Sequence, residues 1–171
     1  RKFDAELTFA ALAPELGSAP GQLTLSQMKE EYNWDRIDPA TALAGVVGHP
    51  VDHSLSPAMH NRAYRQMGVN AVYLKFDVAD SPEAFDRFIE EFRARPWLGL
   101  MGLSVTIPHK GHALDYVRRH GGCLDPLAER IGAVNTLVFT AQGLVKGYNT
   151  DYAGILKTLE ISAGLGPAGL A

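Results

Sequence analysis

The sequence predicts an α/β fold, namely a three-layer α/β/α domain with a mostly parallel mixed sheet. From residue 41 onward, short apolar runs typical of buried strands alternate with stretches of helical periodicity. Two further strand-like runs, 136–139 and 144–148, flank a turn and add an antiparallel hairpin. Hydrophobic residues make up 46% of the 171 residues and charged residues 20%, so the apolar content excludes disorder over the whole length.

The composition argues against several classes of protein. Lys and Arg number 16 against 19 Asp and Glu, a net charge of -3, so we expect no nucleic-acid partner. The single cysteine, Cys123, excludes an intrachain disulfide and a CxxC zinc site. No apolar run approaches the roughly 18 residues of a membrane span and no signal peptide opens the chain, so we expect no membrane partner and a cytoplasmic location. The chain opens on Arg1-Lys2 without Met, and we expect it to be a fragment.

Residues 1–38 differ from the rest of the chain. Residues 7–12 are compatible with a short strand or the start of a helix, and residues 18–22 form a turn-rich loop. A helical spacing of Leu25, Met28 and Tyr32 follows, and Asp38-Pro39 ends it. We expect the stretch to bury little by itself, and residues 1 to about 18 to be mobile or to pack opportunistically.

The first strand and helix of the predicted domain lie in residues 43–68. The apolar run 43–48 is short enough for a buried strand. After a loop, Ser56-Pro57 is typical of an N-cap followed by the first helical residue. Met59, Ala63 and Met67 then recur every four residues, and Gly68 can end the helix.

The second strand and helix show the clearest periodicities. Apolar residues at 72, 74, 76 and 78 alternate with Tyr73, Lys75 and Asp77, which predicts a strand. Ser81-Pro82 then opens a helix with four apolar residues at helical spacing: Phe85, Phe88, Ile89 and Phe92.

The remaining elements follow the same alternation. Residues 98–106 predict a third strand that Pro108 ends, and a helical stretch around residues 113–117 follows. Asp125-Pro126 opens a short helix before the hairpin, whose turn is Gln142-Gly143. Asn149-Thr150-Asp151 caps a last helix with four apolar residues on one face: Tyr152, Ile155, Leu156 and Leu159.

Ser54 and Ser56 stand at a strand-to-helix turn, where ligands of such sheets bind. Free N–H groups and a partial positive charge at a helix start suit an anion, and two hydroxyls two residues apart can donate to one carboxylate. The alternative is that Ser56 is only an N-cap and Ser54 a turn residue.

Lys110 follows the third strand, four residues after the hydroxyl of Thr106. A lysine held at a strand end can act as a general acid or base, although most lysines are solvated surface residues. Asn135 lies between a helix and a strand, where its amide suits a polyhydroxylated ligand or merely a turn. Asp151 lies in the first turn of a helix, either as a functional carboxylate or only as a match to the helix dipole.

Two motifs do not have the context that their function needs. Residues 164–169 match GxGxxG, but a helix precedes them and no strand does, so we expect no cofactor binding by them. The pairs His49/His53 and His109/His112 have helical spacing, but Pro50 disturbs the first pair and further ligands are not placed, so we expect no metal site.

Four motifs in one order along the chain carry a family resemblance. They are Gly48-x-Pro50-x-x-His53-Ser54-x-Ser56-Pro57-x-x-His60-Asn61, Val105-Thr106-x-Pro108-x-Lys110, Ile131-Gly132-Ala133-Val134-Asn135-Thr136 and Gly147-x-Asn149-Thr150-Asp151. With them, residues 43 to 161 resemble the N-terminal, substrate-binding domain of shikimate dehydrogenase. Ser104 stands where many members carry Asn, and the plant-like members resemble this chain in having Ser.

The resemblance implies an NADP-dependent interconversion of 3-dehydroshikimate and shikimate. It implies that Ser54 and Ser56 bind the substrate carboxylate, and that Thr106, Asn135 and Asp151 hydrogen-bond the ring hydroxyls. Lys110 and Asp151 match the catalytic pair. The NADP-binding domain of the family follows this one, so we expect NADP in the full-length parent, none bound by this chain, and no turnover by the chain alone.

Residues 1–38 resemble the end of a type I 3-dehydroquinate dehydratase, a lyase, followed by a linker. The order is similar to that of the bifunctional dehydratase–dehydrogenase of plants. We therefore expect a dehydratase remnant at 1–38, the dehydrogenase substrate domain at 39–161 and a truncated linker at 162–171. Two alternatives stay open: a quinate/shikimate dehydrogenase, and a non-catalytic binding or regulatory module on the same fold.

Overall fold

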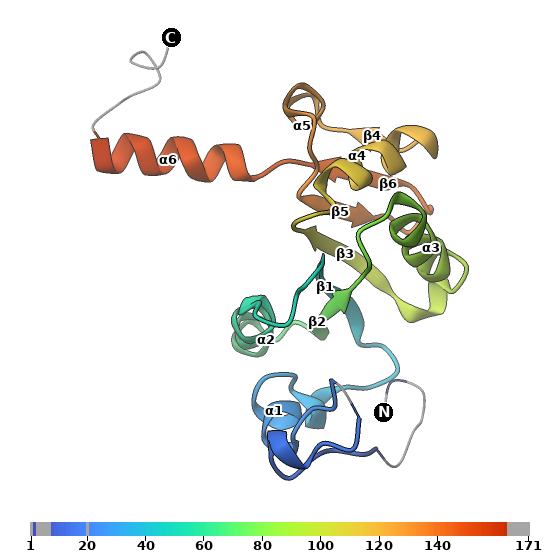
Figure 1. Ribbon diagram of the computed structural model, residues 1–171, viewed down its shortest axis with the longest axis vertical. Coiled ribbons are helices and arrows are strands. Elements are labelled where there is room, and N and C mark those ends of the chain that lie inside the picture. The colour runs from blue at the N-terminus through green and yellow to red at the C-terminus, as the bar shows by residue number, and fades with distance from the viewer. Residues whose placement is uncertain (1, 3–7, 20, 164–171) are drawn as a thin grey trace.

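A computed structural model describes residues 2, 8–19 and 21–163. Its centre is a six-stranded sheet of order β2-β1-β3-β5-β6-β4 (Figure 1). The strands are β1 (Ala42–Gly48), β2 (Ala71–Asp77), β3 (Leu100–Val105), β4 (Cys123–Leu124), β5 (Thr136–Phe139) and β6 (Val145–Tyr148).

Among these strands, only β5 runs against the common direction. β1 pairs in parallel with β2 and β3, and β4 pairs in parallel with β6. β5 is antiparallel to both β3 and β6. The mostly parallel mixed sheet and the hairpin predicted from the sequence are therefore confirmed.

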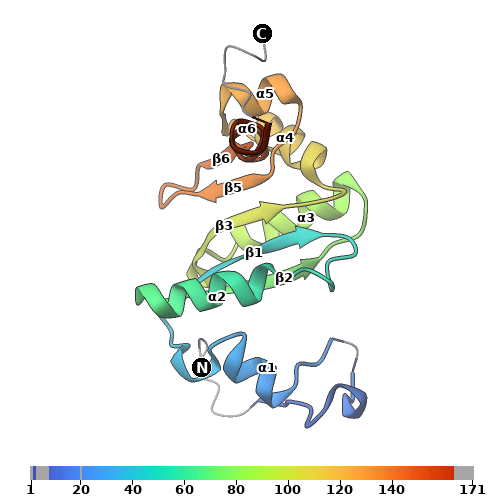
Figure 2. The ribbon, with the colours of Figure 1, turned by 90° about the vertical axis from the view of Figure 1, so that its left-hand side faces the viewer.

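Helices cover both faces of the sheet. They are α1 (Leu25–Glu30), α2 (Ser56–Met67), α3 (Pro82–Arg93), α4 (Lys110–Arg119), α5 (Pro126–Ile131) and α6 (Asp151–Ala163), with short 3-10 turns η1 (Pro14–Leu16), η2 (Trp34–Arg36) and η3 (Pro96–Leu98). Figure 2 shows α2 in front of the sheet and α3 behind it. The main core joins α3, α4 and α5 to one face, and a smaller cluster around Val46 and Tyr73 lies on the α2 face.

The capping residues that the sequence shows are used at α3 and α5. The Ser81 hydroxyl accepts from the Ala84 N–H at 3.0 Å, and the Asp125 carboxylate accepts from the Leu127 N–H at 3.0 Å. At α2 the predicted cap is wrong by one residue, because the helix begins at Ser56 and Leu55 is its N-cap.

The predicted apolar stripe of α2 does not face the sheet. Met59 is 63% exposed and Met67 76%, whereas Pro57 and Asn61 are buried. The reason is that Asn61 binds the edge strand β2: its amide donates to the Tyr73 carbonyl at 2.9 Å and accepts from the Tyr73 N–H at 2.7 Å. A polar residue that satisfies a strand edge has therefore set the orientation of the helix.

The N-terminal stretch buries more than the sequence indicated. Tyr32 packs with Leu43 of β1 and Val72 of β2, and Met28 of α1 is also buried. Residues 7–12 form neither a regular strand nor a helix where they are described, since Ala11 makes only an isolated bridge with Thr24. Residues 1 and 3–7 lie outside the described part, so the expected mobility of residues 1–18 stays a prediction.

Helix α6 projects away from the sheet (Figure 1). Its predicted apolar face is largely exposed, with Tyr152 at 45% and Ile155 at 60%. Leu156 and Leu159 of the same face are partly buried. The GxGxxG match at 164–169 lies outside the described residues.

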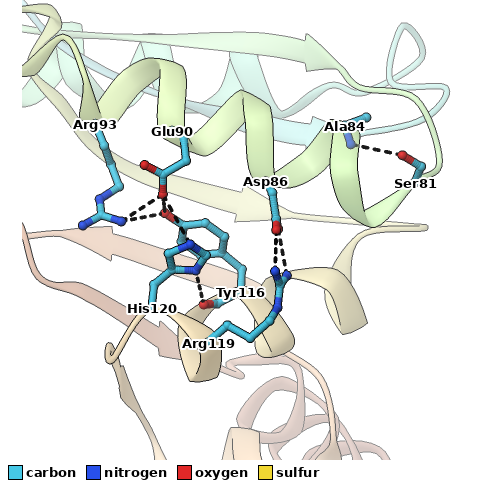
Figure 3. Close-up of polar contacts among 8 residues, drawn as sticks. All are labelled: Ser81, Ala84, Asp86, Glu90, Arg93, Tyr116, Arg119 and His120. Carbon is cyan, nitrogen blue, oxygen red and sulfur yellow. Dashed lines mark hydrogen bonds and ion pairs between the residues drawn. The ribbon is translucent and has the colours of Figure 1, made fainter.

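A polar network closes the junction between α3 and α4 (Figure 3). The buried Tyr116 hydroxyl donates to the Glu90 carboxylate and accepts from the Arg93 guanidinium at 3.0 Å. Arg119 makes a two-point ion pair with Asp86, with contacts of 2.6 and 2.9 Å. Both contacts tie α3 to α4, where the same helices also share the apolar core.

None of the helices within the described ranges combines the length and the apolar character that crossing a membrane requires.

Candidate active site

The predicted site residues meet at one edge of the sheet. The loop after β1, the loop after β3 and the start of α6 enclose a cavity of about 490 Å³. All predicted residues line it: Ser54, Ser56, Thr106, Lys110, Asn135 and Asp151. The edge is the carboxyl end of β1 and β3, where ligands of α/β sheets bind.

Lys110 and Asp151 form an ion pair in this cavity. The Lys110 Nζ lies 2.6 Å from the Asp151 Oδ2, although the two residues are 41 positions apart in the sequence. Each is the first residue of its helix, α4 and α6. The Lys110 ammonium lowers the pKa of the Asp151 carboxyl, a hydrogen bond from Asn135 lowers it further, and burial opposes both. Lys110 is therefore not the solvated surface lysine of the alternative interpretation.

Asn135 hydrogen-bonds to the carboxylate of Asp151, the acidic member of that pair. Its Nδ2 donates to the Asp151 Oδ1 at 2.7 Å and to the Thr150 hydroxyl at 3.0 Å. Its Oδ1 accepts from the Thr136 hydroxyl at 2.9 Å and from the Thr150 N–H at 3.0 Å. The amide is thus an organising group of the site and not only a turn residue.

Ser54 and Ser56 present hydroxyls at the start of α2. The Ser54 Oγ accepts from the Ser56 N–H at 3.3 Å, so Ser54 itself bonds to the first turn of the helix. Since Ser56 is not the N-cap, its hydroxyl is not used in capping, and among the described residues it has no hydrogen-bond partner. It is therefore available to donate to an anion in the cavity.

The cavity contains further polar groups that are not among the predicted site residues. His53, Ser104, Thr136 and Thr150 also line it. Ser104 pairs with Thr136 across β3 and β5, and it lies two residues before Thr106. The period-two rule would have found Ser104 and Thr106 on one side of an extended segment, but only the pairing with β5 brings Thr136 beside them.

The two loops at the cavity approach each other closely because Gly48 ends β1. A Cβ on Gly48 would lie 2.4 Å from the Thr106 Cγ2 and 3.0 Å from the Ile107 carbonyl oxygen. The backbones are joined there by Thr106 N–H to the Val47 carbonyl at 3.0 Å and His49 N–H to the Ile107 carbonyl at 3.1 Å. Cis peptide bonds precede Pro50 and Pro108 in these loops.

Of the two histidine pairs, only His109 and His112 contact each other, with their Nδ1 atoms 3.1 Å apart. His109 is fully buried, and its Nε2 lies 2.8 Å from the Val78 carbonyl oxygen. Burial lowers the pKa of His109, so the neutral ring is favoured. His49 contacts Asp77 at 2.6 Å. Within the described ranges, no group of three His, Cys, Asp or Glu side chains is placed to hold a metal.

A larger cavity of about 610 Å³ lies at a different place, between α3, the start of β3 and the end of β5. Its charged residues Glu90 and Arg93 are already paired with each other and with Tyr116. The smaller cavity is the better candidate for an active site, because it combines an ammonium, a carboxylate and several hydroxyls. Such a set can bind a polyhydroxylated acid and move a proton at one of its oxygens.

Comparison with known proteins agrees with this chemistry. A family model described as the shikimate dehydrogenase substrate binding domain matches residues 46–137. The chain is 44% identical over 133 residues to the shikimate dehydrogenase (NADP(+)) of Methanopyrus kandleri, covering 78% of this chain and 42% of that protein.

Two further similarities extend the comparison. The chloroplastic bifunctional 3-dehydroquinate dehydratase/shikimate dehydrogenase of Arabidopsis thaliana is 39% identical over 160 residues, covering 93% of this chain and 25% of that protein. The crystal structure of a shikimate dehydrogenase from Thermus thermophilus in complex with NADP(H) and shikimate superposes with a TM-score of 0.60 at 36% identity, covering 73% of this chain and 43% of the other.

The chain thus spans less than half the length of each of these relatives. The fold, the family model and the sequence identities all indicate the same family. The region that the family model matches includes the cavity residues from the loop after β1 to Thr136. The chain belongs to the shikimate dehydrogenase family and carries that family's substrate-binding domain.

Proposed function

We propose that this chain binds shikimate and 3-dehydroshikimate, and that the whole protein interconverts them with NADP. The observation that carries the proposal is the Lys110–Asp151 pair in a cavity that also holds Ser54 and Ser56. A titratable cation and a carboxylate suit proton transfer at an alcohol or ketone oxygen. The hydroxyls at the start of α2 suit the carboxylate of the same ligand.

When bound by the whole protein, NADPH would supply the hydride that reduces the carbonyl carbon of the substrate. Lys110 donates a proton to the oxygen of that carbonyl, which becomes the alcohol, and the reverse reaction returns the proton to Lys110. Asp151 keeps the ammonium oriented, and Asn135 fixes Asp151. Thr106 lies in the same cavity, where its hydroxyl can bond to a ring hydroxyl.

The carboxylate subsite is tested by titrating the chain with shikimate in a calorimeter. We expect Ser54→Ala combined with Ser56→Ala to weaken binding about 10- to 100-fold, since two hydrogen bonds to a charged group are removed. Ser26→Ala is the matched control, because Ser26 is exposed on α1, away from the cavity. Unchanged affinity of the double variant would refute the assignment.

Quinate is the comparison ligand in the same titration. It is also an acid with ring hydroxyls, so it separates a shikimate site from a quinate/shikimate site. Binding of neither acid would leave the non-catalytic module as the better description of this chain.

We also propose that residues 1–38 derive from a 3-dehydroquinate dehydratase, ahead of a dehydrogenase domain at 39–161 and a linker at 162–171. Support comes from the plant bifunctional relative, whose similarity spans 160 residues of this chain, against 133 for the Methanopyrus kandleri enzyme. Dehydration of 3-dehydroquinate by the full-length protein tests this origin. A cytoplasmic location completes the proposal and is tested by fractionating cells that contain the full-length protein.

A further inference from the structure

Tyr73 of β2 is held on two sides by consecutive residues of α2. Its ring stacks on His60 with centroids 4.2 Å apart and planes 9° from parallel. Its backbone N–H and carbonyl are both bound by the Asn61 amide, at 2.7 and 2.9 Å. Tyr73 is 3% exposed, so these contacts lie in the interior of the protein.

The hydroxyl of this ring is buried, and no hydrogen bond of ordinary geometry joins it to a described residue. An unpaired buried hydroxyl is costly, and such groups in folded proteins nearly always have a partner. The Ser104 hydroxyl is the neighbouring polar group: burial raises the pKa of Tyr73, and Ser104 acts against that by stabilising the charged form. Apart from Tyr73, the Ser104 hydroxyl has no hydrogen-bonding partner among the described residues.

The strand register places both residues under the substrate cavity. Tyr73 is paired with Ala44, Val46 with Ser104, and Ser104 with Thr136, along neighbouring strands. Tyr73 packs in one cluster with Val46 and Val51, and both valines line the cavity together with Ser104. Tyr73 thus lies behind the cavity wall, and Ser104 lies in it.

We propose that Tyr73 is a positioning residue of the substrate site, whose hydroxyl donates to the Ser104 Oγ and turns the Ser104 O–H toward the ligand. A serine hydroxyl rotates freely and can donate only once. Once it accepts from Tyr73, its own proton points into the cavity and selects a ligand oxygen that accepts there, such as a ring hydroxyl oxygen. Tyr73 touches neither substrate nor cofactor and acts through Ser104; the inference rests on the proposed function.

The experiment measures shikimate affinity of the chain in a double-mutant cycle of Tyr73→Phe and Ser104→Ala. Tyr73→Phe keeps the ring, the stack on His60 and the backbone contacts, and removes only the hydroxyl. We expect it to weaken binding about 3- to 10-fold, and to have no effect once Ser104 is Ala. Tyr64→Phe is the matched control, since Tyr64 packs against the same cluster.

A second measurement does not depend on shikimate. In the chain labelled with 13Cζ-tyrosine, the Tyr73 resonance reports the hydrogen bond of its hydroxyl at neutral pH. We expect Ser104→Ala to shift this resonance and to leave that of Tyr64 unchanged. A protein that binds no shikimate would refute the proposed function, whereas an unmoved Tyr73 resonance or additive effects in the cycle would refute the role of Tyr73.

Discussion

At the scale of single residues, the site depends on how Asp151 is stabilised as a carboxylate. Lys110 and Asn135 each contact one of its oxygens, at 2.6 and 2.7 Å. It also stands first in α6, and its N–H is bound by the Asn149 side chain at 3.1 Å. The contacts of the carboxylate with Lys110 and Asn135 favour the charged form, which is the form that can orient an ammonium.

Asp151→Asn tests this stabilisation through the pH dependence of unfolding. The pKa of Asp151 is lowered in the folded state, chiefly by Lys110, so its contribution is present above the unfolded pKa and is lost as the pH falls through the folded value. We expect the variant to be less stable by at most about 1 kcal/mol at pH 7, because the side chain is 48% exposed, and equal to the parent at about pH 2.

Thermal unfolding across that pH range provides the measurement. Asp35→Asn is the control, since Asp35 is an exposed carboxylate on η2 with no partner among the described residues. A stability difference for Asp151→Asn that persists unchanged at low pH would contradict the ion-pair explanation.

At the scale of elements, α3 and α4 are joined by both apolar and polar contacts. Phe85 and Ile89 of α3 and Val117 of α4 are fully buried in the main core. Tyr116 is buried with them, but its hydroxyl reaches the Glu90–Arg93 pair at the rim of that core (Figure 3). Burial and the Glu90 contact raise the pKa of Tyr116 to about 12, so it stays a neutral donor under ordinary conditions.

We expect Tyr116→Phe to lower the free energy of unfolding by about 1.5 to 3 kcal/mol, the range for hydrogen bonds to charged groups. The ring and its packing are kept, so the loss reports the hydroxyl alone. Urea unfolding followed by circular dichroism measures it, with Tyr152→Phe as the control because Tyr152 is 45% exposed on α6. Equal stability of the two variants would show that the network contributes nothing measurable.

At the scale of the whole molecule, the question is where NADP binds. The share of the relatives that this chain covers bears on it. The chain spans 42% of the Methanopyrus kandleri enzyme and 43% of the structure that contains NADP(H) and shikimate. The cavity that holds Lys110 and Asp151 is lined by residues of this chain. We propose that NADP is held by parts of the full-length protein that lie outside this chain.

The corresponding prediction is that the chain alone binds shikimate without oxidising it. With shikimate and NADP present, we expect no formation of NADPH above background, while the full-length protein forms it. Absorbance at the NADPH band follows the reaction, and Lys110→Met in the full-length protein is the matched inactive control. Turnover by the isolated chain would contradict the placement of the cofactor site.

The sequence by itself determined the structural features that depend on residues close together in the chain. The periodicity of Phe85 and Ile89 predicts the buried face of α3, and the turn at Gln142-Gly143 predicts the hairpin, because each signal lies within one element. The motifs, through their resemblance to a family, likewise predicted polar residues that the structure places around one cavity.

Only the tertiary structure decided how these pieces face one another. The orientation of α2 follows from Asn61 bound to a strand edge, and the burial of Tyr73 follows from that helix lying on it. The contact of Lys110 with Asp151 follows from the positions of α4 and α6 at one edge of the sheet. The physical reason is that a pattern of residues records which side of an element is apolar, whereas a hydrogen bond between distant residues depends on strand order and register, which no local pattern contains.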